Sequence, residues 1–220
     1  MPGLSFSVES AAAIPYAAAP TIAFRLKTVN PLPSQAIQNI ALRCQILIEA
    51  SRRHYKPRER ESLRDLFGEP DRWSQTLRSL LWTQATVTVQ PFTDSVLTDL
   101  AVPCTFDFNV GAAKYFHAIQ EDDVPLCFQF SGTIFYAAPD GTMQIDQIGW
   151  DKEARFRLPS LVWREMMDHY YPNSAWLRLG REAFERLYEY KRERGIATWE
   201  ETIEQLIPAK TTSLKKEAAS

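Results

Sequence analysis

Residues 38–49 read QNIALRCQILIE and alternate apolar with mostly polar side chains. The apolar members of this alternation are Ile40, Leu42, Cys44, Ile46 and Ile48. Successive side chains of a β-strand point to opposite faces, so this pattern is typical of a strand that buries one face. Arg43, Gln45 and Glu49 fall on the other face, which we expect to meet solvent. The segment therefore predicts a long, half-buried strand and with it a sheet.

The same alternation occurs in residues 21–29, TIAFRLKTV. Between the two segments, residues 30–34 read NPLPS, which is the composition of a turn. A parallel connection between neighbouring strands would need a dozen or more residues. We therefore predict that the strands at 21–29 and 38–49 pair with each other as antiparallel neighbours.

Four further segments favour strands by the same criteria. They are residues 80–89, 97–108, 124–136 and 143–150. The last two are joined by AAPDG, a sequence typical of a hairpin turn. Residues 110–119 fit either a short helix or a strand. That choice stays open at this stage, and it changes the order of strands in the sheet.

The spacing of apolar side chains changes from two to about 3.6 after residue 156, which indicates helices. Helices are predicted from Pro159, over about 180–194, and from Thr198, where TWEE matches a capping box. A short helical insertion is predicted near residues 57–79, because Pro57 suits the first turn of a helix.

Strands followed by helices indicate an α+β protein. We expect an antiparallel β-sheet or sandwich body over residues 1–156 and a C-terminal cap of about three helices over residues 157–207. Residues 208–220 show no apolar pattern, so we expect a disordered tail there.

The composition is that of a globular protein, with 45% hydrophobic and 24% charged residues. Lys and Arg number 25 against 27 Asp and Glu, so the net charge of −2 gives no general attraction to nucleic acid or to an anionic membrane. No apolar run is long enough for a membrane-spanning helix, and residues 1–24 lack the features of a secretory signal. Three widely spaced cysteines argue against a disulfide framework. We therefore expect a cytoplasmic protein without membrane insertion.

The charge is unevenly distributed along the chain. Residues 51–80 hold eight Lys or Arg and five Asp or Glu. Residues 81–150 hold one Lys and eight Asp or Glu. The basic segment contains Arg52 and Arg53, which become candidates for contact with a protein partner because charge sets orientation and association rate. The alternative is that this segment packs near the acidic strands of its own fold or is only solvated.

No motif in the chain identifies a reaction. Cys44, Cys104 and Cys127 have no C-x-x-C spacing, and neither a nucleophile elbow nor a phosphate-binding glycine loop is present. We accordingly predict no catalytic residues, no metal site and no cofactor. If a small-molecule pocket exists between sheet and cap, the polar side chains best placed to line it are His117, His169, Asp146 and Asp151.

Aromatic residues gather near the end of the chain, with ten of the 26 in residues 150–199. Most would attach the helical cap to the sheet, since aromatic side chains dominate cores. Tyr170, Tyr171 and Trp176 stand at a helix end and in a loop, where full burial is harder. Exposed aromatics are enriched at interaction hot spots, so these three are candidates for protein binding.

Seven segments together resemble an uncharacterised bacterial protein family whose genes accompany clusters for actinobacterial-type nickel–iron hydrogenases. The segments are YAAAPTIAFRL (16–26), LFGEPDRW (66–73), VPCTFDF (102–108), AKYFH (113–117), FSGTIFY (130–136), WDKEA (150–154) and WREMMDHY (163–170). The resemblance implies a role beside a multi-subunit redox enzyme, in its assembly or as an associated component, and supplies no catalytic residue. The chain lacks the Cys/His pairs of a metallochaperone.

Three functional hypotheses follow. The first is a non-enzymatic, chaperone-like accessory protein that binds a protein partner, such as a hydrogenase subunit or maturation factor, through strand edges and exposed aromatics. Its layout of strands followed by helices is similar to that of SecB-type export chaperones. The second is an enzyme or small-molecule binder with a pocket between sheet and cap. The third is a homo-oligomeric scaffold.

Overall fold

The computed structural model describes residues 3–105, 110–119, 122–138, 140–174 and 179–207. The chain forms two compact units, which divide between Ser174 and Ala175. This division differs from the boundary expected at 156/157. The reason is that helix α5 (Ser160–Tyr170) packs on the strands and on another helix of the first unit.

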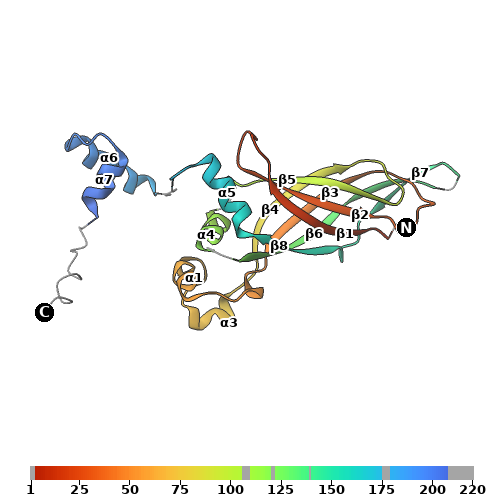
Figure 1. Ribbon diagram of the computed structural model, residues 1–220, viewed down its shortest axis with the longest axis horizontal. Coiled ribbons are helices and arrows are strands. Elements are labelled where there is room, and N and C mark those ends of the chain that lie inside the picture. The colour runs from red at the N-terminus through yellow and green to blue at the C-terminus, as the bar shows by residue number, and fades with distance from the viewer. Residues whose placement is uncertain (1–2, 106–109, 120–121, 139, 175–178, 208–220) are drawn as a thin grey trace. The chain divides into compact units, whose positions relative to one another are not determined.

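Two antiparallel sheets make up most of the first unit, which confirms the α+β class (Figure 1). Sheet A has the order β1 (Ser5–Ala13), β2 (Thr21–Val29), β5 (Ser95–Pro103). Sheet B has the order β4 (Leu80–Val89), β3 (Ile37–Ile48), β6 (Asp123–Ala137). The free side of β6 is shared by β7 (Met143–Gln147) and β8 (Glu153–Pro159).

The predicted pairing of 21–29 with 38–49 is wrong. Strand β2 lies between β1 and β5, and β3 lies between β4 and β6, so the short link between β2 and β3 crosses from one sheet to the other. Buried Asn30 holds this crossing. Its side-chain nitrogen lies 2.9–3.0 Å from the carbonyl oxygens of Leu32, Gln35 and Thr93. A short loop excludes a parallel connection, but it does not distinguish a hairpin from a crossing between sheets.

Strands β1 and β8 were not anticipated from the sequence. In β1 the register shifts between Val8 and Ser10, which breaks the period of two and hides the alternation. Strand β8 pairs with the first half of β6, whereas β7 pairs with its second half. The predicted hairpin 124–136/143–150 therefore exists, with a further strand beside it.

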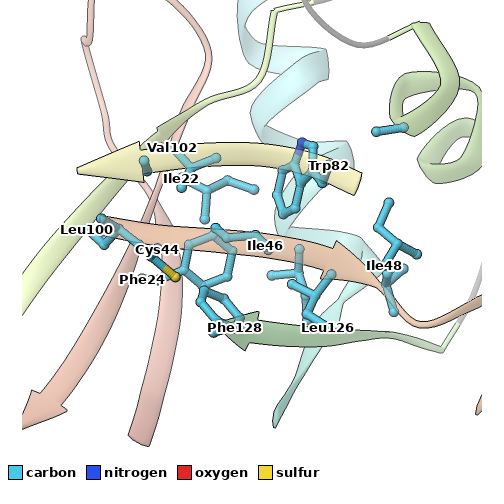
Figure 2. Close-up of a cluster of buried hydrophobic side chains, with 14 of the residues drawn as sticks. Ile22, Phe24, Cys44, Ile46, Ile48, Trp82, Leu100, Val102, Leu126 and Phe128 are labelled. Atoms are coloured by element: carbon cyan, nitrogen blue, oxygen red, sulfur yellow. The ribbon is translucent and has the colours of Figure 1, made fainter. Parts of the chain in front are cut away.

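The two sheets pack face to face around the side chains that the alternation assigned to the interior (Figure 2). The ring of Phe24 in sheet A is fully buried, and its centroid lies 5.0 Å from that of Phe128 and 6.0 Å from that of Trp82 in sheet B. Ile46 and Cys44 of β3 are likewise buried in this layer. The core thus joins strands that are distant in sequence.

Helices gather at one end of the strands, whereas β7 lies at the other end (Figure 1). Besides α5 they are α1 (Pro57–Ser62), α2 (Arg64–Phe67), α3 (Trp73–Thr76) and α4 (Val110–Ala118). Two 3-10 turns span Ala50–Arg52 and Pro70–Arg72. Residues 110–118 are helical because Ala112, Tyr115 and Phe116 form one buried stripe.

The second unit contains α6 (Arg181–Glu193) and α7 (Trp199–Leu206). The Thr198 hydroxyl accepts a hydrogen bond from the Glu201 amide, so Thr198 caps α7 as its sequence predicts. Within the described residues, the protein has no helix with both the length and the apolar character needed to cross a membrane.

Replacing Phe24 with Ala should lower the free energy of unfolding by about 3–5 kcal/mol, because the cavity forms where the two sheets meet. Leu97→Ala is the control, since Leu97 is exposed on sheet A and its loss should change stability by about 0.5 kcal/mol or less. Urea unfolding followed by circular dichroism measures both. Equal effects of the two substitutions would show that Phe24 does not join the sheets as described.

Candidate functional site

A hollow of about 400 Å³ opens between the C-terminal end of β1 and helix α5. We call it the β1–α5 groove. Its lining residues are Ala11, Ala12, Ala13, Ile14, Pro15, Tyr16, Val162, Glu165, Met166, His169 and Tyr170. The β1 wall consists of small side chains and backbone, and the α5 wall consists of residues three and four positions apart, which share one face of a helix.

Two contacts orient α5 so that this face borders the groove. On the buried side of the helix, the Trp163 ring stacks on Phe116 with centroids 5.4 Å apart. At its C-terminal end, the Tyr170 hydroxyl donates a hydrogen bond of 2.8 Å to the Ala17 carbonyl. The second contact ties the loop between β1 and β2 to the helix. These contacts therefore fix the two walls of the groove relative to each other.

Tyr16 stands at the end of this groove with 90% of its surface exposed. Its φ of +58° lies in the left-handed region, which residues with a side chain rarely adopt. The Tyr16 ring meets the His169 ring edge to face, with centroids 6.2 Å apart, and His169 in turn lies 5.3 Å from the Tyr170 ring. Three aromatic rings from two distant segments thus meet at the groove.

The free edge of β1 is the second feature of the site. Strand β1 pairs with β2 on one side and, within the part of the chain that the structure describes, with no strand on the other. Its N-terminal half carries a bulge and Glu9, two features that discourage pairing at a sheet edge. Residues 10–13, SAAA, carry neither charge nor bulge. This half of the edge therefore lacks both of the features that discourage pairing.

Two of the predicted protein-binding residues belong to the basic segment, and the structure separates them. Arg52 is exposed and pairs with Glu49 at 3.1 Å. The Arg53 side chain is only 5% exposed and forms an ion pair of 2.8 Å with Glu59, which is 3% exposed. Arg53 as a surface contact is therefore wrong. It secures α1, and the sequence could not show that Glu59 would be buried against it.

The predicted aromatic candidates fall in three different settings. Tyr170 lines the groove, as described, and Tyr171 is half-buried against the core. Trp176 lies outside the described residues. Trp150, in the turn between β7 and β8, is 96% exposed, although the sequence did not single it out.

The four polar pocket candidates do not converge on one hollow. His169 lines the β1–α5 groove. His117 is exposed on α4, whereas Asp146 belongs to β7 and Asp151 to the turn after it. Strand β7 lies at the opposite end of the strands from α4 and α5 (Figure 1). The described residues also contain no cluster of three or more His, Cys, Asp or Glu side chains suited to a metal ion.

Sequence reasoning found Tyr170 and His169 but missed Tyr16 and the alanines of β1. Their segment shows no alternation and no chemical motif, and its exposed tyrosine becomes informative only when α5 lies beside it. The one sequence signal is an aromatic residue next to Pro15 within an otherwise small and weakly polar stretch.

A model of a family of unknown function, DUF6084, matches residues 1–215. None of the curated proteins matches the chain in sequence. Among solved structures, the ApaA protein from Bordetella pertussis is similar at 12% identity and a TM-score of 0.24, covering 70% of this chain and 91% of that one. A late embryogenesis abundant protein is similar at 17% identity and a TM-score of 0.30, covering 73% and 74%. Likenesses this weak support no inference about this chain.

The three cysteines should resist thiol reagents in the folded protein. Burial raises the pKa of Cys44 and Cys104 to about 12, and burial together with the Glu153 and Glu49 carboxylates raises the pKa of Cys127 to about 11. The reactive thiolate is therefore scarce at pH 8. We expect slow reaction with a disulfide reagent at pH 8, fast reaction of all three thiols in urea, and faster reaction of Cys127 as the pH approaches 11. Fast modification of Cys127 in the folded protein at pH 8 would contradict this.

Proposed function

The chain belongs to DUF6084, a family of unknown function, and we propose that it is a non-enzymatic accessory protein that binds an extended segment of a partner protein in the β1–α5 groove. The observation that carries this proposal is the exposed Tyr16 ring beside the uncharged, open edge of β1. Strand addition to a sheet edge is a recurring mode of peptide recognition.

The two walls of the groove would make different kinds of contact with the bound segment. Backbone groups along residues 10–13 supply hydrogen bonds to an added strand, and the small alanine side chains allow its backbone to approach closely. Val162 and Met166 on α5 supply an apolar surface for alternate side chains of that strand. A volume of about 400 Å³ lies within the range of ligand pockets.

The Tyr16 ring would supply much of the binding energy. A tyrosine that is almost fully exposed in the free protein can bury a large area when a partner covers it, and Tyr is enriched at hot spots. Its left-handed backbone points to the same conclusion, because strained conformations cluster at functional sites.

The partner suggested by the resemblance of the sequence is a cytoplasmic hydrogenase subunit or maturation factor. Tagged protein purified from the native host at low salt tests this identity by mass spectrometry. Recovery of such a protein with the native chain, and its loss with Tyr16→Ala, would support it. Recovery of the same partner with the native protein and with the Tyr16→Ala variant would place the contact outside the β1–α5 groove.

Tyr16→Ala should weaken peptide binding by about tenfold or more without changing the thermal midpoint of unfolding. The probes are peptides selected for binding from a random display library, with affinities measured by calorimetry. Bound peptide should slow hydrogen exchange at the amides of residues 10–14, because a strand added there protects them. Trp150→Ala is the matched control, since Trp150 is an equally exposed aromatic that does not line the groove.

Two results would contradict the proposal. One is a library that yields no peptide whose binding protects residues 10–14. The other is equal loss of affinity in Tyr16→Ala and Trp150→Ala, which would indicate general adhesion to exposed aromatics.

A further inference from the structure

A second and larger hollow, of about 560 Å³, opens on the outer face of sheet B. It lies over β4, β3 and β6 and is separate from the β1–α5 groove, since the two share no lining residue. Its polar lining side chains are Arg43, Thr86, Thr88, Ser131, Thr133 and Gln147. We call it the Arg43 hollow.

The hollow forms over Ala41, an outward-facing position of β3 that carries only a methyl group, and beside Gly132, where β6 approaches β3 closely. Gly132 of β6 has a φ of +140°, and a Cβ there would lie 2.1 Å from the Ala41 carbonyl oxygen. Only glycine permits β6 to approach β3 this closely. Ala41 is paired with Thr88 on one side and Thr133 on the other, so its methyl group leaves a depression between two longer side chains.

Hydrogen-bond donors surround the single charged group of this hollow. Arg43 is paired directly with Thr86 of β4 and with Ser131 of β6. Directly opposite residues of antiparallel strands have Cβ atoms about 4.5–5.5 Å apart, so the arginine side chain rises between two hydroxyl groups. The Gln147 amide, which donates to the Thr133 hydroxyl at 3.1 Å, borders the same space.

The electrostatic setting favours an anion. No carboxylate lines the hollow, although residues 81–150 carry a net charge of −7. Arg43 forms no ion pair with any described residue, in contrast to exposed Arg25, which holds Asp99 through two hydrogen bonds of 2.9 Å. Arg43 thus lines an open, polar hollow without an ion-pair partner among the described residues.

We propose that the Arg43 hollow binds a small molecule through a carboxylate or phosphate group. A guanidinium matches either group with two parallel hydrogen bonds, and the Thr86 and Ser131 hydroxyls can donate to the remaining oxygens. Beyond Arg43 the face continues as a row of amides, in which Gln84 donates to Gln45 at 3.2 Å and Gln45 to Gln129 at 3.4 Å. This row suits the uncharged polar part of such a ligand.

The test is a titration of the full-length, isotope-labelled chain with inorganic phosphate and, separately, with citrate, followed by amide NMR. We expect saturable shifts centred on Arg43, Thr86, Ser131 and Gly132. The anion that binds more tightly distinguishes a phosphate ligand from a carboxylate ligand. Arg43→Gln should weaken binding by about tenfold or more.

Arg157→Gln is the matched control, because Arg157 is another exposed arginine of sheet B and does not line the hollow. It should leave the affinity unchanged. Equal affinity in Arg43→Gln and the native chain would overturn the proposal. So would shifts centred on the basic residues 51–80, or the absence of a saturable response to both anions.

Discussion

The burial of Phe24 between the two sheets is the contact on which the rest of the structure depends. A sheet with one apolar face is stabilised by burying that face against another element, and the inner face of sheet A does so by covering sheet B. The Phe24 ring meets aromatic rings from three strands of sheet B, at centroid distances of 5.0 Å for Phe128, 6.0 Å for Trp82 and 6.1 Å for Phe156. Because the inner faces of the two sheets are buried against each other, only their edges and outer faces are accessible to other molecules.

Strand β6 shows how a feature that builds the fold also shapes its surface. The strand pairs with β8 along its first half and with β7 along its second half, and Gly132 lies between the two. The close approach of Gly132 to β3 keeps the sheet continuous at this change of partner. On the outer face, Gly132 lines the Arg43 hollow, whose floor at Ala41 carries only a methyl group.

The β1–α5 groove arises from a different constraint, the incomplete protection of an edge strand. A bulge and Glu9 discourage strand pairing along the first half of β1. The second half lies beside helix α5, with a hollow between the two. The helix is held there by Trp163 on its buried side and by Tyr170 at its end. The second half of the edge is thus unpaired on one side within the described residues, and the hollow beside it is the groove that we propose binds an extended segment.

The sequence by itself determined most of the strands and helices and the buried face of those strands that alternate regularly. It did not reveal β1 or β8, and it left 110–119 open between helix and strand. Alternation in 38–49, the helical stripe after Pro159 and the Thr198 cap depend on local backbone geometry, which neighbouring residues encode. Only the tertiary structure decided which strands are neighbours, that Arg53 is buried with Glu59, and that Tyr16 meets His169. These outcomes join residues far apart along the chain. Side chains that alternate between apolar and polar show that one face of a strand is buried. The alternation carries no information about which distant residue will cover that face.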